Sequence, residues 1–167
     1  MASPQILWDA SGLVKRYYQE AGQAAVNAIF QAVPLRDMAI TPWGYAETYS
    51  ILLRKRNGGS LDQSAFRDAI TELQMEVIDV AGFTVLSIGD ALVFGSVSLM
   101  AAHNINSADA AILATYLRFQ RASQERCMLI ASDRRLVRAV EAEGLRALNP
   151  EEVSAGGIPN ALASVQG

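Results

Sequence analysis

The chain has 167 residues, of which 51% are hydrophobic and 19% charged, and its formal net charge is −3. This composition excludes a disordered chain and fits one globular domain with a substantial core. The negative net charge argues against a protein that holds nucleic acid by bulk positive charge, although it leaves room for a local basic rim.

Simple sequence features also bear on location. A single cysteine, Cys127, allows no internal disulfide and fits a reducing cytoplasm. The N-terminal stretch MASPQILWDAS has no basic region before its apolar residues, so we expect no signal peptide. The longest strongly apolar run, residues 91–102, falls well short of the roughly 20 residues that a membrane-spanning helix needs. We therefore expect a cytoplasmic protein with no membrane partner.

Short apolar runs alternate with helical patterns along the chain. The predicted strands cover residues 5–9, 37–41, 83–88, 127–132 and 145–148. The predicted helices cover residues 11–20, 22–33, 43–57, 60–76, 89–104, 107–122 and 133–144. This alternation predicts an α/β fold in which helices cover both faces of a parallel sheet.

Several helix ends carry local signals. Thr41 supplies an N-cap and Pro42 a first-turn proline for the helix that follows the second strand. We expect Ser60 to cap the helix at 60–76 and Ser107 to cap the helix at 107–122. The C-terminal residues are rich in small residues and turn formers. We therefore expect a domain at 1–149 followed by a weakly ordered tail at 150–167.

Four acidic residues occupy related places in this layout. Asp9 ends one predicted strand and Asp133 follows another, while Asp109 lies in the first turn of a helix and Glu47 in the second turn of another. In an open parallel sheet, the carboxyl ends of the strands and the amino ends of the following helices share one edge, where ligands bind. We therefore expect the four carboxylates to meet at that edge, although they are far apart in sequence.

Each acid also has a structural alternative. Asp9 could cap the first helix, and Asp109 and Asp133 could simply favour helix dipoles. Glu47 is harder to explain in this way, because its neighbours in YAETYSILL look packed and a buried acid is costly without a partner. Together, however, the four charges would repel, since two unit charges 4 Å apart cost about 4 kcal/mol at an effective dielectric constant of 20. Such a cluster needs a cation. Oxygen ligands with no nearby histidine or cysteine select hard ions such as Mg²⁺ or Mn²⁺, which support in-line hydrolysis at phosphates.

Four segments carry a resemblance to a known family: WDASGLVKRYY, AETYSILLRK, SADAAILATYL and ASDRRL. In this order they resemble the acidic motifs of PIN-domain ribonucleases, particularly the VapC-like toxins of toxin–antitoxin pairs, over residues 5–149. The resemblance implies a PIN-like three-layer α/β/α fold with a central parallel sheet of four to five strands. It also implies that one set of residues is both catalytic and metal-binding, with two supporting hydroxyls. The acids are Asp9, Glu47, Asp109 and Asp133, and the hydroxyls belong to Ser11 and Ser132.

The resemblance further implies Mg²⁺, with Mn²⁺ as a second possibility, and cleavage of RNA. It implies a homodimer and a cognate antitoxin whose peptide covers the active-site groove. Gly12 departs from the family pattern, in which a larger apolar residue is usual, and we expect it to loosen the first helix. The tail is longer than most such toxins carry.

The neighbours of several other residues in the sequence suggest their roles. Lys15 and Arg134 each lie near an acid, so each is a candidate for contacts to RNA phosphates, with an equal structural alternative. His103 ends a predicted helix, where a position favourable to the helix dipole is more typical than a catalytic base. Cys127 starts a buried strand and is expected in the core.

A dimer surface is predicted from the aromatic residues near the N-terminus. Tyr17 and Tyr18 follow Lys15 and Arg16, a composition typical of interfaces. We expect a two-fold dimer that involves the helices around residues 13–57, with both active sites facing one groove.

Competing classes of protein require residues that differ from those present. A receiver domain needs paired acids after its first strand and a late lysine, but the only lysines here are Lys15 and Lys55. A haloacid-dehalogenase-like phosphatase needs a second aspartate where this chain has Ser11. Two alternatives stay open: a housekeeping PIN-domain nuclease that processes RNA, and a non-catalytic PIN-like binding module. The binding module would be expected to lack at least one of the four acids, and none is missing.

Overall fold

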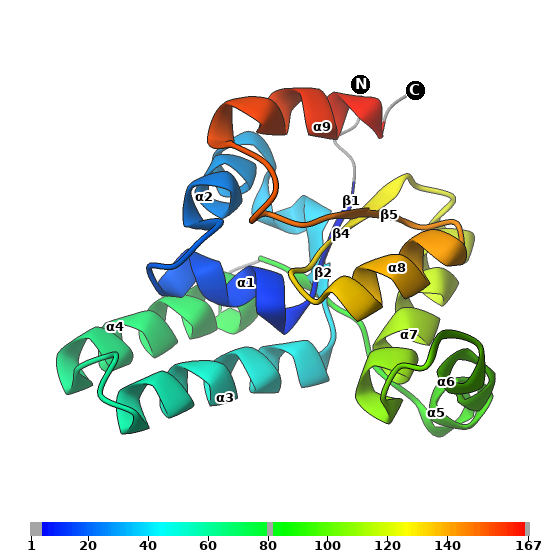
Figure 1. The fold of residues 1–167 in the computed structure, drawn as a ribbon, viewed down its shortest axis with the longest axis horizontal. Coiled ribbons are helices and arrows are strands. Elements are labelled where there is room, and N and C mark those ends of the chain that lie inside the picture. The colour runs from blue at the N-terminus through cyan, green and yellow to red at the C-terminus, as the bar shows by residue number, and fades with distance from the viewer. Residues whose placement is uncertain (1–4, 80–81, 166–167) are drawn as a thin grey trace.

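The computed structural model describes residues 5–79 and 82–165 and contains a five-stranded parallel sheet. The strands pair in the order β3-β2-β1-β4-β5, and Figure 1 shows them at the centre of the molecule. The prediction of a parallel sheet with four to five strands is therefore confirmed. The strands are β1 (Gln5–Trp8), β2 (Met38–Ile40), β3 (Thr84–Val85), β4 (Cys127–Ile130) and β5 (Arg146–Leu148).

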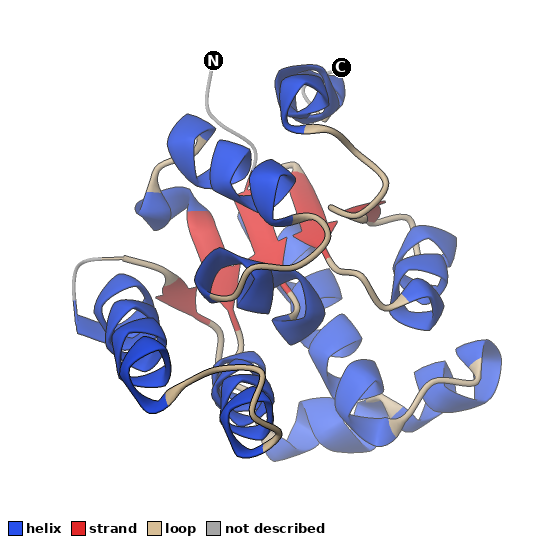
Figure 2. Cartoon of the chain, turned by 60° about the vertical axis from the view of Figure 1, so that its left-hand side comes forward, coloured by secondary structure: helices blue, strands red, loops and turns tan. Residues whose placement is uncertain are grey.

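Helices cover both faces of this sheet, as Figure 2 shows from a second side. They are α1 (Ala10–Tyr17), α2 (Gln23–Ala32), α3 (Pro42–Asn57), α4 (Gln63–Gln74), α5 (Asp90–Gly95), α6 (Val97–His103), α7 (Ser107–Ser123), α8 (Arg134–Ala142) and α9 (Ile158–Ser164). Short helical turns lie at η1 (Leu35–Asp37), η2 (Met75–Asp79) and η3 (Ala155–Gly157). In the described residues, no helix is both long and apolar enough to cross a membrane.

Alternating side chains of the strands build two apolar layers. Ile6 and Trp8 of β1 pack with α1, α2, α4 and α9 on one face of the sheet. Leu7, between them, packs with α7 and α8 on the other face. Successive side chains of a strand point to opposite faces, so a strand buried on both sides must be apolar throughout. This arrangement is the three-layer α/β/α architecture that the sequence predicted.

The caps of the helices are only partly those expected. The Thr41 hydroxyl accepts a hydrogen bond from the amide of Gly44 at 3.0 Å, which confirms Thr41 as the N-cap of α3. The predictions for Ser60 and Ser107 are wrong. Asp62 caps α4, and Asn106 caps α7, leaving Ser107 as the first helical residue. A carboxylate or amide one or two residues away competes successfully with a serine hydroxyl for the same free amides.

The apolar segment predicted as one helix at 89–104 forms two. α5 ends and α6 begins at Ser96, a buried residue whose hydroxyl donates to the carbonyl oxygen of Val93 at 2.7 Å. A serine hydroxyl bonded to a nearby backbone carbonyl offers the chain an alternative to a regular helix.

Gly12 tightens the first helix instead of loosening it. A Cβ atom on Gly12 would lie 2.6 Å from the carbonyl oxygen of Ile130, a clash with the backbone of β4. The absence of a side chain therefore lets the first turn of α1 lie directly against the end of β4. The expectation of a loosened helix is wrong, because the position selects for close backbone approach.

The C-terminal segment is also better ordered than expected. Residues 155–164 form η3 and α9, and Figure 1 shows α9 beside α2. Ile158, Leu162 and Val165 are buried in the same apolar layer as α1 and α2. The tail is therefore not the weakly ordered appendage predicted for residues 150–167, although its last two residues lie outside the described part of the chain.

Candidate active site

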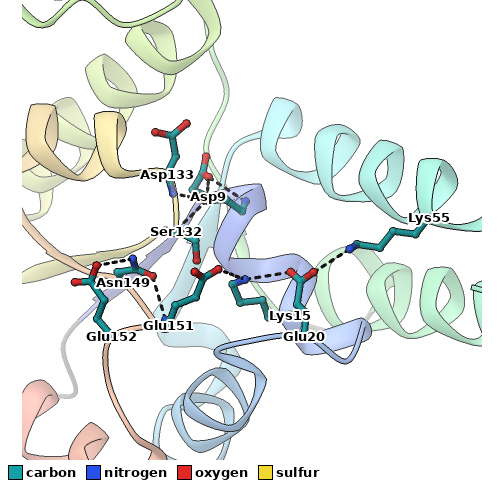
Figure 3. Close-up of polar contacts among 10 residues, drawn as sticks. Asp9, Lys15, Glu20, Lys55, Ser132, Asp133, Asn149, Glu151 and Glu152 are labelled. Atoms are coloured by element: carbon teal, nitrogen blue, oxygen red, sulfur yellow. Dashed lines mark hydrogen bonds and ion pairs between the residues drawn. The ribbon is translucent and has the colours of Figure 1, made fainter. Parts of the chain in front are cut away.

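Two of the four acids meet where β1 and β4 end. β1 and β4 are neighbours with Trp8 opposite Ile130, so Asp9 and Asp133 leave the sheet at the same edge. Each is the N-cap of the helix that follows, α1 for Asp9 and α8 for Asp133. Figure 3 shows them side by side. Capping uses Oδ2 of Asp9 and Oδ1 of Asp133, and the described residues supply no donor to the second oxygen of either.

The Ser11 hydroxyl ties these two strand ends together. It donates a hydrogen bond to Oδ2 of Asp9 and accepts one from the amide of Ser132 at 2.9 Å. It also lies 3.3 Å from the amide of Asp133. The hydroxyl of Ser132 is buried and has no hydrogen-bond partner in the described structure. A buried polar group without a partner is costly, so it marks this edge as a place built for something other than stability.

Asp109 lies in the first turn of α7, as the sequence predicted. Asn106, the N-cap of that helix, makes two bonds to it. Its side-chain oxygen accepts from the amide of Asp109 at 2.8 Å, and its side-chain nitrogen donates to Oδ2 of Asp109 at 2.7 Å. Asn106 therefore fixes both the helix start and the rotamer of the acid. Asn106 is not among the residues predicted from the sequence, although an Asx residue three positions before the acid is a recognisable cap signal.

Burial and the negative charges of neighbouring carboxylates raise pKa values at this edge of the sheet. Burial raises the pKa of Asp109 to about 6, and the negative charges of Asp9, Asp133 and Glu47 add to the rise, partly opposed by the bond from Asn106. Burial also raises the pKa of Asp9, against the lowering effect of the bonds from Ser11, and the charge of Asp133 raises it further. These mutual effects place the four acids within electrostatic range of each other.

Glu47, on α3, is the fourth acid, but it does not lie in the packed surroundings expected for it. Its side chain is exposed, and Ala46 beside it is exposed too. Burial of part of its carboxyl and the charge of Asp9 raise its pKa, while the charge of Arg54, two helical turns further along α3, lowers it. An exposed acid needs no partner to be tolerated, so the sequence argument from the cost of burial does not hold for Glu47.

Chemistry and electrostatics of the four acids fit a hard divalent cation, but their side chains are not gathered around one point. Within residues 5–79 and 82–165, no three His, Cys, Asp or Glu side chains lie close enough together to hold a metal ion. Hydrogen bonds to Ser11, Asn106 and the first amides of α8 occupy one oxygen of each aspartate. The donor set is oxygen-only, the kind that Mg²⁺ and Mn²⁺ prefer.

Of the two predicted RNA contacts, the structure leaves one accessible. Lys15 is only 3% exposed, and its ammonium lies 3.1 Å from Glu20 and 2.7 Å from Glu151 (Figure 3). Lys15 therefore binds the tail to α1 and does not face solvent, so its predicted contact to phosphate is not supported. Arg134 is exposed and reaches Glu152 only at 3.6 Å.

The remaining candidates lie away from the acids. His103 ends α6, as expected, and its Nε2 lies 2.6 Å from Oε1 of Glu143. Cys127 is buried in β4, where burial raises the pKa of its thiol to about 12. Neither residue belongs to the acidic edge, which is the edge of the sheet that carries Asp9, Glu47, Asp109 and Asp133. Tyr116 does support it from below, because its hydroxyl, buried under the sheet edge, donates to the carbonyl oxygen of Trp8.

Comparison with known proteins places the fold in a family. The family model of the PIN domain matches residues 6–142, and the chain belongs to that family. This confirms the family suggested by the four motifs. No curated protein matches the chain at a significant level.

Solved structures show the same fold at low sequence identity. FitAcB from Neisseria gonorrhoeae is 17% identical with a TM-score of 0.61, and the match covers 89% of this chain and 99% of that one. VapC20 from Mycobacterium tuberculosis, described as a Sarcin-Ricin loop cleaving toxin, is 14% identical with a TM-score of 0.58, covering 80% and 94%. A toxin–antitoxin complex from Klebsiella pneumoniae is 16% identical with a TM-score of 0.56, covering 89% and 99%.

Proposed function

We propose that this PIN-domain protein is a metal-dependent endoribonuclease and the toxin of a toxin–antitoxin pair. The observation that carries the proposal is the presence of Asp9, Glu47, Asp109 and Asp133 at one edge of the sheet, where burial and neighbouring negative charges raise the pKa values of Asp9, Glu47 and Asp109. Carboxylates with perturbed pKa values at the ligand-binding edge of a parallel sheet are typical of a functional site.

The four acids would hold Mg²⁺ or Mn²⁺. When bound, such an ion activates water for attack on a phosphodiester and stabilises the leaving oxygen. The chain's own groups supply the placement. The first turns of α1 and α8 anchor Asp9 and Asp133, Ser11 fixes the distance between them, and Asn106 orients Asp109. Arg134, exposed beside Asp133, is our remaining candidate for a phosphate contact.

The proposed partners are an RNA substrate and an antitoxin protein, both met in the cytoplasm. Relatives of the same fold include a named toxin and a toxin–antitoxin complex, which supports this choice over a housekeeping nuclease that processes RNA. The presence of all four acids supports a nuclease over a non-catalytic binding module.

A homodimer is also proposed, but through another surface than the one predicted. Tyr17 is buried, and its hydroxyl donates to Glu76 at 2.8 Å, so it is not available to a second copy. Large apolar side chains face outward instead on α5 and α6. Phe94 of α5 is 76% exposed and Val97 of α6 is 53% exposed. Light scattering at tens of micromolar tests this assignment, since Phe94→Asp should give a monomer where the wild type is a dimer.

Expression in the absence of a partner tests the proposed activity. The wild type should arrest growth and cleave cellular RNA, and Asp109→Ala should relieve the arrest while the protein stays folded. Asp90→Ala is a matched control, because Asp90 is also an acid in the first turn of a helix but lies outside the cluster. Equal arrest by wild type and Asp109→Ala would exclude RNA cleavage as the cause. RNA cleavage in vitro without arrest would favour the housekeeping nuclease.

A further inference from the structure

Trp43 is the most unusual apolar side chain near the acidic edge. It is the second residue of α3, and 62% of it is exposed, whereas tryptophan is usually well buried. The chain's other tryptophan, Trp8, is fully buried and packs against Phe30. Among the described residues, Trp43 makes no aromatic or cation–π contact. Its indole face is therefore available to a ligand.

Trp43 forms one wall of a small apolar hollow. The hollow has a volume of about 170 Å³, and its other walls are Val93 of α5 and Ser107, Ala108 and Ala111 of α7. Pockets for whole small molecules are larger, about 300 Å³ or more. A hollow of this size with a flat aromatic wall fits one planar ring system.

The position of the hollow relative to the acids indicates which ring system would bind there. Trp43 precedes Glu47 by four residues on α3, so the two side chains lie on the same face of the helix, one turn apart. On α7, Ser107 and Ala108 directly precede Asp109. The hollow is thus within one helical turn of two of the four acids. An RNA strand whose phosphate lies at the acids would bring the base of a neighbouring nucleotide to this hollow.

We infer that the hollow binds one unpaired nucleobase next to the phosphate that is cleaved, stacked on the indole of Trp43. The inference rests on the proposed nuclease function and narrows its substrate to RNA with an unpaired nucleotide at the cut. A base inside a duplex is stacked on its neighbours and cannot reach a side chain in this way, whereas a loop or single strand exposes its bases to aromatic residues. Every base offers a stacking face, so Trp43 selects for unpaired structure and not for sequence.

Binding of an eight-nucleotide single-stranded RNA tests the inference. We would measure it with Ca²⁺ as the ion, because Ca²⁺ also takes oxygen ligands, and check on a gel that the RNA stays intact. Trp43→Ala should weaken binding roughly 5- to 100-fold, the range that base stacking on an aromatic side chain supports. Trp43→Phe, which keeps a stacking face, should bind within about threefold of wild type on the same grounds.

Two controls separate stacking from a general loss of binding. Tyr49→Ala removes the other exposed aromatic of α3, whose ring packs edge-on against Phe66 and does not line the hollow, and it should leave affinity unchanged. An abasic backbone of the same length should bind the wild type as weakly as the complete RNA binds Trp43→Ala. The affinity for the abasic backbone should be the same in Trp43→Ala as in wild type. A duplex of the same sequence should bind wild type and Trp43→Ala alike.

Tryptophan fluorescence gives a readout independent of cleavage. Because Trp8 and Trp43 are the two tryptophans of the chain, the difference between wild type and Trp43→Phe isolates the emission of Trp43. The single-stranded RNA should quench this emission and shield Trp43 from acrylamide. Equal RNA affinity of wild type and Trp43→Ala overturns the inference. So does a Trp43 that is shielded from acrylamide in the RNA-free protein, since a second copy or another protein then covers the hollow.

Failure of the proposed function has a different signature. If the wild type cleaves no RNA with Mg²⁺ or Mn²⁺ but the single strand still quenches Trp43, the nuclease is wrong and the base-binding hollow stands. If the wild type cleaves RNA and Trp43→Ala has the same KM and kcat, the nuclease stands and the hollow is wrong. A wild type that neither binds nor cleaves the RNA excludes both.

Discussion

Two charged clusters of this molecule differ in how their carboxylates are neutralised. The first is the lysine network, in which the buried Lys15 lies between Glu20 and Glu151 and Lys55 pairs with Glu20 at 2.8 Å. Burial alone would raise the pKa of Glu20, but hydrogen bonds from Lys55 and Lys15 lower it below its ordinary value. Charges of alternating sign make this cluster self-sufficient, as Figure 3 shows.

The second is the acidic edge of Asp9, Glu47, Asp109 and Asp133. There burial and like charges raise the pKa values of Asp9, Glu47 and Asp109, and Arg54 opposes the effect only at Glu47. Helix α1 contributes to both clusters, with Asp9 as its N-cap and Lys15 further along. In one cluster the protein's own lysines neutralise the carboxylates, and in the other the carboxylates stay negative. Carboxylates with raised pKa values of this kind are typical of functional sites, where a bound ligand can supply the missing positive charge.

Cleavage of RNA should separate the two clusters most strongly. Asp109→Asn at the acidic edge should reduce the rate at least about 100-fold, more than the 10- to 100-fold loss typical when only an outer partner of a metal ligand is removed. Glu20→Gln in the lysine network changes one carboxylate in the same way and should leave the rate per folded molecule near that of wild type. Single-turnover assays with equal folded protein measure both. Similar losses in the two variants would mean that the acidic edge has no special role.

The free energy of unfolding should change in the opposite order, with the larger loss in variants of the lysine network. Lys15→Met removes the buried cation and leaves Glu20 and Glu151 facing each other across the gap between α1 and the tail. Breaking a fully buried pair costs about 3–5 kcal/mol, but both glutamates keep contact with water, so we expect about 2 kcal/mol. Urea denaturation measures the loss, with the more exposed Lys55→Met as the smaller matched change. A Lys15→Met protein as stable as wild type would show that the network contributes nothing.

The sequence revealed the acidic edge because strand ends and helix starts are local signals. Asp9, Asp109 and Asp133 each stand next to a predicted boundary, and the topology of a parallel sheet brings such boundaries to one edge. The order of the four motifs then identified the family, which its model confirmed. What local patterns could not give was the geometry of the side chains, and Glu47 proved to be exposed where a packed position was expected.

The lysine network escaped prediction for a different physical reason. Lys15 and Glu151 are 136 residues apart, and no local pattern relates them. The tail looked weakly ordered because small residues dominate it, yet Ile158 and Leu162 bury enough apolar surface against α2 to form α9. Gly12 was misjudged similarly, because the carbonyl of Ile130 that requires a glycine lies on another strand.

Metal should stabilise the protein through the acidic edge alone. If Mg²⁺ or Mn²⁺ binds with a dissociation constant of about 1 mM, 10 mM of the ion adds about 1.4 kcal/mol, which raises the melting temperature by about 3–6 °C. Asp9→Asn should reduce this rise in melting temperature. Lys15→Met should show the same rise as wild type, starting from a lower melting temperature. Differential scanning fluorimetry with and without the ion measures all three. An unchanged wild-type melting temperature at millimolar ion would contradict the cluster as a metal site.

The smallest expected effect concerns Asp109 in the absence of metal. Its pKa is about 6 in the folded protein against 3.8 ordinarily, so the folded state holds a proton that the unfolded state has released. Stability from this group is fully present below about pH 4 and is lost as the pH rises through 6, because ionisation then adds a fourth charge to the edge. Asp109→Asn keeps nearly the same volume and removes that charge. In chelator at pH 8 it should therefore be more stable than wild type. Solvent screening of a half-buried group limits the gain to about 1 kcal/mol. Below pH 4 the gain should vanish. Urea titrations at the two pH values measure it, with Asp90→Asn as the control outside the cluster. A destabilised Asp109→Asn at pH 8 would show that the carboxylate stabilises the fold, most simply through its bond with Asn106. The charges of the acidic edge would then be neutralised within the protein, as those of the lysine network are.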